Sequence, residues 1–124
     1  MAYFSTMTTS EIATVLAWHD ALNEKDIETL IRLSSYDIEI ADAHAAVQGI
    51  GALRQWAEGF SGTITVGRMY EHDGVVVFEQ TLADGTTQAS AFRVVRDHVT
   101  SVFRHDDLRA ALAATDLTED DLDE

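Results

Sequence analysis

Three charged side chains fall at positions where a small α+β protein could hold a catalytic group. Asp42 ends the alternating segment 37–42, which predicts a strand that carries a carboxylate at its end. Arg104 lies near the end of the predicted last strand, and Glu79 lies within an otherwise apolar strand. A carboxylate in a dry pocket has a raised pKa and can act as a general base, and an arginine can orient it or bind an oxyanion. We therefore take these three residues as the candidate catalytic groups.

Each candidate also has a purely structural interpretation. Asp42 could cap the turn that follows its strand, as Asp readily does. Arg104 could be an exposed strand-end arginine, or it could pair with Asp42 or Glu79. Glu79 faces a cavity, opposite Ser90, if the hairpin at 83–86 closes as a two-residue turn. A slip of one residue would turn it to the other face.

A set of apolar residues and one serine is predicted to bind the substrate as the wall of a pocket. They are Trp18, Trp56, Phe60, Met69, Ser90, Phe92 and Val102. The same side chains could equally form the core, because helices close the open side of such a sheet.

The histidines are weaker candidates for chemistry. His44 and His105 could take part in catalysis, whereas His19 is expected on the surface of its helix or at an interface. No pair of histidines has the i, i+4 helical spacing of a metal site, and the sequence has no glycine-rich phosphate loop and no serine triad. No cofactor and no metal are therefore implied.

The periodicity of apolar residues predicts the elements that position these groups. Thr8 and Glu11 have the spacing of a capping box, which places the start of the first helix near residue 9. The expected helices cover 9–23, 27 to about 34, a segment after Gly49 and Gly51, and 107–114; the expected strands cover 37–42, 62–71, 75–83, 86–96 and 99–105. Helices followed by a meander of long antiparallel strands predict an α+β fold in which a curved sheet wraps over helices.

Composition and charge define the class of protein. The 124 residues form one domain over 9–114, with an N-terminal extension at 1–8 and an acidic tail at 115–124 that is expected to be mobile. The net charge of −14 disfavours nucleic acid and anionic membranes as partners. The chain has no cysteine, no secretory signal and no membrane-length apolar run, so a cytoplasmic protein is expected.

Several segments resemble the nuclear transport factor 2-like superfamily, in particular its SnoaL-like enzymes and their ketosteroid isomerase relatives. The resemblance covers about residues 10–114 and is carried by segments 15–26, 38–42, 49–53 and 99–104. It implies a cone-shaped, curved antiparallel sheet wrapped around N-terminal helices. It also implies a pocket inside the cone and cofactor-independent chemistry of the isomerase, polyketide cyclase or hydrolase type.

The resemblance gives roles to individual positions. Asp42 falls where ketosteroid isomerases place the proton-abstracting Asp, Trp18 where they have an oxyanion-hole Tyr, and Ser90 where they have a protonated Asp. Indole lacks phenolic acidity and a serine hydroxyl is a weaker donor than a protonated carboxyl, so these two replacements disfavour steroid isomerisation. Arg104 stands where many SnoaL-like cyclases and limonene epoxide hydrolase-like proteins carry an acidic residue.

Two functions therefore remain open. The first is a small enzyme acting on an apolar organic substrate by isomerisation, cyclisation or hydration, with Asp42 as general acid or base. The second is a non-catalytic module for ligand binding or dimerisation on the same fold. An enclosed cavity in which Asp42 touches Arg104 would favour the enzyme, and a cavity filled by Trp18 and Phe92 would favour the module. A homodimer is expected through an apolar outer face of the sheet that carries Phe78, Leu82 and Phe103.

Overall fold

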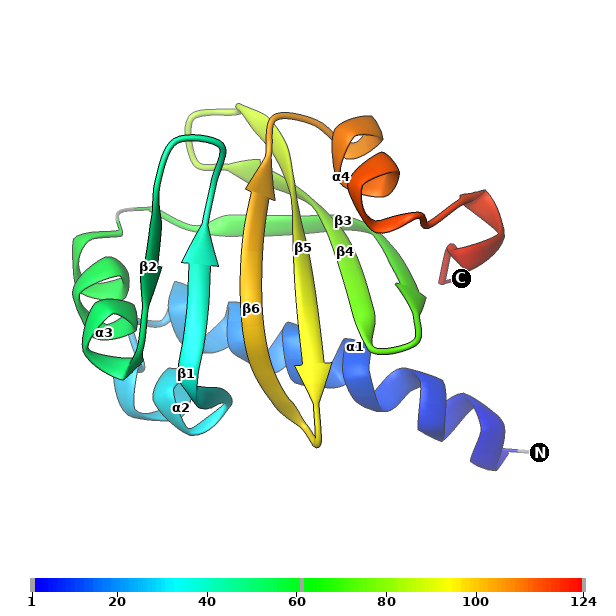
Figure 1. Ribbon diagram of the computed structural model, residues 1–124, viewed down its shortest axis with the longest axis horizontal. Helices are drawn as coiled ribbons and strands as arrows, with labels where there is room; N and C mark the ends of the chain where they lie inside the picture. Colours follow the sequence, from blue (N-terminus) through cyan, green and yellow to red (C-terminus); the bar gives the residue numbers. More distant parts are fainter. Residues whose placement is uncertain (1, 61, 124) are drawn as a thin grey trace.

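The computed structural model describes residues 2–60 and 62–123 and combines one curved sheet with helices on both of its faces (Figure 1). The helical elements are α1 (Ala2–Asn23), α2 (Ile27–Arg32), α3 (Ile50–Gly59), α4 (Leu108–Thr115) and the 3₁₀ turn η1 (Glu119–Asp121). The strands are β1 (Ser34–Ala41), β2 (Ala46–Gln48), β3 (Ile64–His72), β4 (Val75–Leu82), β5 (Thr87–Val95) and β6 (His98–His105). The predicted α+β class is confirmed, and each predicted element is found.

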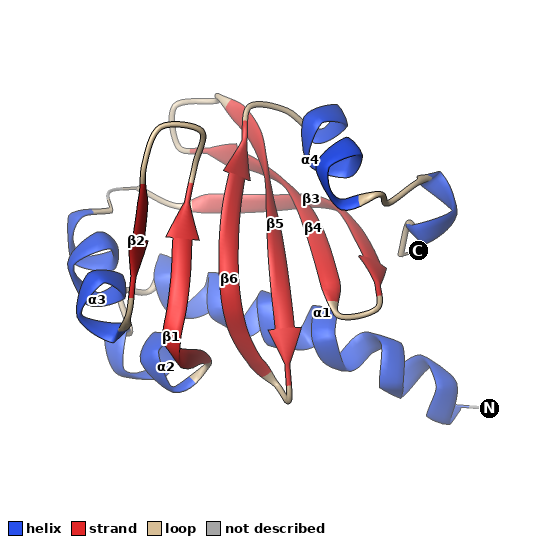
Figure 2. Cartoon of the chain, in the orientation of Figure 1, coloured by secondary structure: helices blue, strands red, loops and turns tan. Residues whose placement is uncertain are grey.

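The six strands form a single open sheet in the order β2-β1-β6-β5-β4-β3 (Figure 2). β1 runs parallel to β6, and every other neighbouring pair is antiparallel. α1 and α3 pack on the inner face, where the main core is centred on Trp18, Leu53, Phe78 and Phe92. α4 packs on the outer face over β4 and β5.

The first helix begins earlier than predicted. α1 starts at Ala2, so the capping box at Thr8 lies within the helix and the predicted extension at 1–8 is helical from residue 2 onward. The short edge strand β2 was not predicted, because its three residues are all exposed and carry no alternating pattern. Among the described residues, no helix combines the length and apolar character that a bilayer crossing requires.

The register of the β4–β5 hairpin differs by one residue from the prediction. Phe78, not Glu79, pairs with Ser90. A two-residue turn of type I′ needs a positive φ at both of its central residues, but here Gly85 has a φ of 88° and Asp84 does not have a positive φ. The loop therefore takes three residues, 83–85, with a hydrogen bond from the Leu82 N–H to the Thr86 carbonyl at 2.8 Å.

The C-terminal segment, expected to be a mobile tail, folds back onto the sheet. Leu117 is buried, and the Tyr70 hydroxyl donates a hydrogen bond to the Glu119 carboxylate at 3.2 Å. Leu122 forms a bridge with Tyr70 on β3. The acidic composition suggested solvation, but the two leucines supply apolar contacts that hold the segment against the outer face.

Candidate functional site

Most of the predicted pocket wall comes together at one small cavity on the inner face of the sheet. Six of the predicted residues line it: Trp18, Trp56, Phe60, Ser90, Phe92 and Val102. Met69 packs against the neighbouring core instead of lining this cavity. Ile64, Arg104 and the amides of Gln80 and Gln88 complete the lining.

The cavity is nearly filled by its own aromatic side chains. Its volume is about 10 Å³, which is about the space that one water molecule needs. The Trp18 ring stacks on Trp56 with centroids 5.9 Å apart and meets Phe92 edge-on at 5.4 Å. The Trp18 indole N–H donates to the Ser34 hydroxyl at 3.0 Å, so this donor is already engaged and does not point to a ligand as an oxyanion-hole group would.

Asp42 and Arg104 lie together at the mouth of the cone. Asp42 Oδ2 is 3.9 Å from Arg104 Nη2, and both side chains are about one-third exposed, at 37% and 34%. Asp42 Oδ1 accepts hydrogen bonds from the backbone N–H groups of His44 (2.8 Å) and Ala45 (2.9 Å). Asp42 therefore does cap the turn after its strand, and it also contacts Arg104.

This environment favours the ionised form of Asp42. The backbone N–H groups of His44 and Ala45 lower the pKa of the Asp42 carboxyl below its usual value, and the positive charge of Arg104 acts in the same direction. A general base near neutral pH requires the opposite shift. In this arrangement Asp42 is a weak base and a fixed negative charge.

A larger hollow of about 420 Å³ opens directly outside the Asp42–Arg104 pair. Its lining comes from the β1–β2 loop, the start of β5, the end of β6 and α4, and includes Asp42, His44, Gln88, Arg104 and His105. Partial burial lowers the pKa of His105, which favours its neutral form. We refer to this hollow as the mouth hollow. Because Arg104 and Gln88 line both the mouth hollow and the inner cavity, they stand at the boundary between the two.

Glu79 does not belong to this site. With Phe78 opposite Ser90, the inner face of β4 carries Phe78 and Gln80, and Glu79 lies opposite Ala89 on the outer face. A carboxylate oxygen of Glu79 lies close to Gly67 of the neighbouring strand β3. The prediction that Glu79 is a pocket acid was wrong because it depended on a two-residue turn.

His19, Gln80 and Gln88 are the residues that the sequence interpretation missed. His19 is 1% exposed, not on the helix surface as predicted, and it stacks on Phe78 inside the cone. Residues 12, 15, 19 and 22 follow one helical stripe, which was a sufficient signal to place His19 inside. Gln80 interrupts an apolar stripe on β4, and a polar group in such a stripe needs partners.

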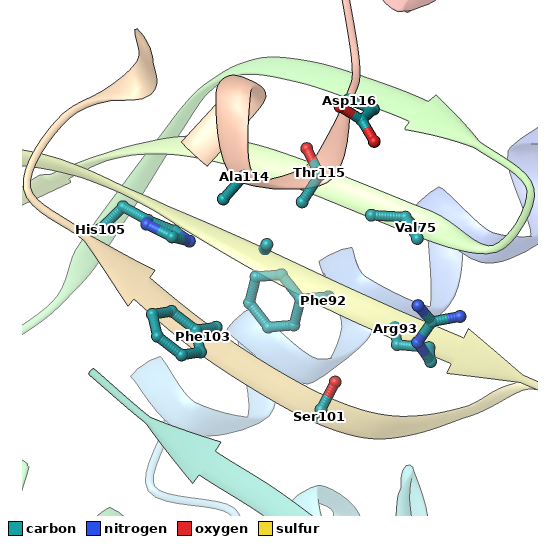
Figure 3. Close-up of a pocket in the computed structure, with 10 residues that line it drawn as sticks. Val75, Phe92, Arg93, Ser101, Phe103, His105, Ala114, Thr115 and Asp116 are labelled. Atoms are coloured by element: carbon teal, nitrogen blue, oxygen red, sulfur yellow. The ribbon is translucent and has the colours of Figure 1, made fainter. Parts of the chain in front are cut away.

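A second hollow of about 490 Å³ lies on the outer face, between α4 and β6, and shares Phe103 and His105 with the mouth hollow. Phe103 and His105 stack at one end of it, with centroids 4.7 Å apart, and Arg93 and Ser101 lie at the other end (Figure 3). Asp116, at the end of α4, closes the opposite wall (Figure 3). Phe103 is 40% exposed here, whereas the other two residues predicted for this face, Phe78 and Leu82, belong to the inner core.

Neither hollow offers a set of metal ligands. Within the described part of the chain, no group of three or more His, Cys, Asp or Glu side chains could hold a metal ion. The chemical groups at the mouth are thus one guanidinium, two carboxylates (Asp42 and Asp106), two imidazoles, two threonine hydroxyls and an amide, next to an aromatic interior.

The arrangement of the strands and helices is similar to that of solved structures. An NTF2-like protein from Cytophaga hutchinsonii superposes with a TM-score of 0.68 at 16% identity, covering 81% of this chain and 92% of its own. The chain has the nuclear transport factor 2-like fold. The predicted superfamily resemblance is confirmed at the level of fold.

Two further solved structures show how varied the proteins of this fold are. An epoxide hydrolase from M. tuberculosis, described as LEH-like, has a TM-score of 0.69 at 16% identity and covers 86% of this chain and 90% of its own. A protein of ketosteroid isomerase-like fold from Catenulispora acidiphila, in complex with trimethylamine, has a TM-score of 0.63 at 20% identity. It covers 86% of this chain and 95% of its own. No protein-family model matches the sequence, and no curated protein matches it. At these identities the likeness concerns the fold alone.

Proposed function

We propose that this protein binds a small apolar organic molecule at the mouth of the cone, with Arg104 as the anchor for an anionic or oxygen-bearing group. The observation that carries the proposal is the position of Arg104 between the mouth hollow and the aromatic cavity. A guanidinium binds carboxylates and other oxyanions through two parallel hydrogen bonds. The mouth hollow, at about 420 Å³, has the size of a small-molecule site.

Binding fits the geometry better than acid–base chemistry does. The carboxylate of Asp42 is held in its ionised form by backbone donors, and Glu79 faces away from the site. The interior is filled by Trp18, Trp56 and Phe92, which matches the arrangement expected of a binding module.

A binding titration with simple carboxylates tests this proposal. Benzoate and cyclohexanecarboxylate are suitable probes, and tryptophan fluorescence reports on binding because Trp18 and Trp56 stack directly behind Arg104. We expect saturable binding to the wild-type protein and at least about tenfold weaker binding to Arg104→Gln, since a charge-assisted bidentate contact is lost. The matched control is Arg93→Gln, an exposed strand arginine on the outer face, which should bind as the wild type does. Equal affinity of the Arg104 and Arg93 variants would refute the anchor.

A second candidate is a cofactor-independent enzyme in which Asp42 acts as general acid or base, for isomerisation, cyclisation or hydration. The contact between Asp42 and Arg104 favours it, as do the structural likenesses to an epoxide hydrolase and to a ketosteroid isomerase-like protein. Asp42→Asn separates the two candidates, because the amide oxygen can still accept the turn hydrogen bonds that Asp42 Oδ1 accepts. Loss of turnover in a folded variant would support the enzyme, and unchanged turnover would remove Asp42 as the base.

A further inference from the structure

A chain of buried hydrogen bonds runs from α1 to the mouth hollow. His19 on α1 lies with its Nε2 2.7 Å from the side-chain nitrogen of Gln80 on β4. The side-chain oxygen of Gln80 accepts hydrogen bonds from the Ser90 hydroxyl (2.8 Å) and from the Gln88 amide nitrogen (3.0 Å) on β5. His19, Gln80 and Ser90 are at most 2% exposed, so water does not compete for these contacts.

Only one assignment of donors and acceptors is consistent with all the hydrogen bonds of this buried network. His19 Nδ1 is 2.9 Å from the Val15 carbonyl oxygen, and a carbonyl can only accept, so Nδ1 carries the proton. Burial lowers the pKa of His19 to about 4, so the ring is neutral and its Nε2 is an acceptor. Gln80 must then turn its NH₂ group toward His19 and its oxygen toward Ser90 and Gln88.

The orientation of the Gln80 amide in turn fixes the orientation of the Gln88 amide at the mouth hollow. Gln88 is committed to donating from its NH₂ group to the Gln80 oxygen, and the two prongs of a planar amide point apart. The carbonyl oxygen of Gln88 is therefore left on the side away from Gln80. Gln88 lines the mouth hollow together with Arg104, so the hollow offers an acceptor next to a cation.

We propose that His19 is a positioning residue that, through Gln80, fixes Gln88 as a hydrogen-bond acceptor and thereby makes the site selective for a ligand that carries both an anion and a hydroxyl donor. This inference rests on the proposed binding function of Arg104. Ser90 pairs with Arg104, and Gln88 lies two residues from Ser90 on the same face, so Arg104 and Gln88 are diagonal neighbours at about 7–8 Å. A six-membered ring that bears a carboxylate and a hydroxyl group on separate carbons spans such a gap.

A set of three matched probes tests the selectivity. Benzoate lacks the second group, 3-hydroxybenzoate adds a donor, and 3-methoxybenzoate adds an oxygen that can only accept. We expect 3-hydroxybenzoate to bind the wild-type protein about tenfold more tightly than the other two, as one hydrogen bond to an oriented acceptor allows. Equal affinity for all three probes would overturn this inference while leaving Arg104 as the anchor. If none of the three probes bound, both this inference and the proposed binding function would be overturned.

Variants then test the route from His19 to Gln88. His19→Leu removes the acceptor that orients Gln80, so the preference for 3-hydroxybenzoate should fall to about twofold or less. His19→Gln supplies an amide oxygen that can accept from Gln80 in place of Nε2, and it should restore the preference. A purely structural role for His19 would lower the affinity for all three probes by the same factor and would contradict the proposal.

Gln88→Leu keeps the test valid even if the His19 variants do not fold, because Gln88 is only partly buried. We expect it to abolish the preference. The matched control is Gln48→Leu on the exposed edge strand β2, which should keep the full preference. An unchanged preference in Gln88→Leu would overturn the proposal.

Discussion

At the scale of single residues, Asp42 and His19 are held in different charge states by their surroundings. Asp42 was predicted to act as a general acid or base, but two backbone N–H groups and Arg104 hold its pKa below the usual value. His19 is a titratable group of the opposite kind, because it is fully enclosed and its pKa is lowered to about 4 by burial. Asp42 is a fixed negative charge, and His19 is a neutral, buried imidazole.

The buried His19 predicts how stability depends on pH. In the unfolded chain His19 has its usual pKa of 6.5, and in the folded chain the pKa is about 4. Between these values the unfolded state binds a proton that the folded state does not, so the free energy of unfolding falls as the pH is lowered from 6.5 to 4. This single group accounts for a loss of about 3 kcal/mol across the window.

Urea unfolding of the wild-type protein and of His19→Gln at pH 7 and pH 4.5 measures this effect. We expect the wild type to lose more stability than His19→Gln, which has no titrating group at this position. His98→Gln, a change at the exposed histidine that begins β6, should behave as the wild type. An identical loss in the wild type and in His19→Gln would show that His19 does not carry the effect.

At the scale of elements, the sequence predicted the number and type of the main helices and strands but not how β4 and β5 pair. Apolar periodicity is a property of each segment by itself, so it identified the strands and most of the pocket wall, Trp18 and Phe92 included. Pairing depends on the turn, and the negative φ of Asp84 sets a three-residue loop that dipeptide composition does not specify. One residue of slip moved Glu79 out of the site and brought Gln80 into it.

The C-terminal segment makes a prediction at the same scale. Leu117 is 6% exposed and packs with Tyr70 and Ala111 on the outer face of the sheet. Leu117→Ala should lower the free energy of unfolding by about 2–3 kcal/mol, because a buried leucine is truncated. Leu16→Ala, a change at a leucine of α1 that is 37% exposed, should cost far less. Denaturant titration measures the free energy of unfolding of both variants. Equal losses would show that Leu117 is not buried against the sheet.

At the scale of the whole molecule, the outer face is only partly covered. α4 and the following segment lie over β3, β4 and β5, whereas Phe103 on β6 remains 40% exposed beside the outer hollow. We propose that two copies associate through this uncovered part of the sheet. Multi-angle light scattering at micromolar concentration should then give twice the mass of the chain.

A charge placed on this surface should separate the copies. Phe103→Glu is expected to yield a monomer, because two carboxylates would be buried at a two-fold interface. Val95→Glu serves as the control, since Val95 is an apolar residue at the end of β5 that is at least as exposed as Phe103. A monomeric wild-type protein, or a dimer in the Phe103→Glu variant, would contradict the proposed interface.

The folded-back C-terminal segment also covers part of the exposed edge of the sheet. β3 forms one edge of the sheet, and an edge strand offers its backbone groups to any passing strand. Here the N–H of Asp123 donates to the Met69 carbonyl at 2.8 Å, and Leu122 bridges Tyr70. The chain's own acidic end thus occupies part of the edge and surrounds it with negative charge. Loss of these few residues would leave this part of the β3 edge open to pairing with a strand of another molecule.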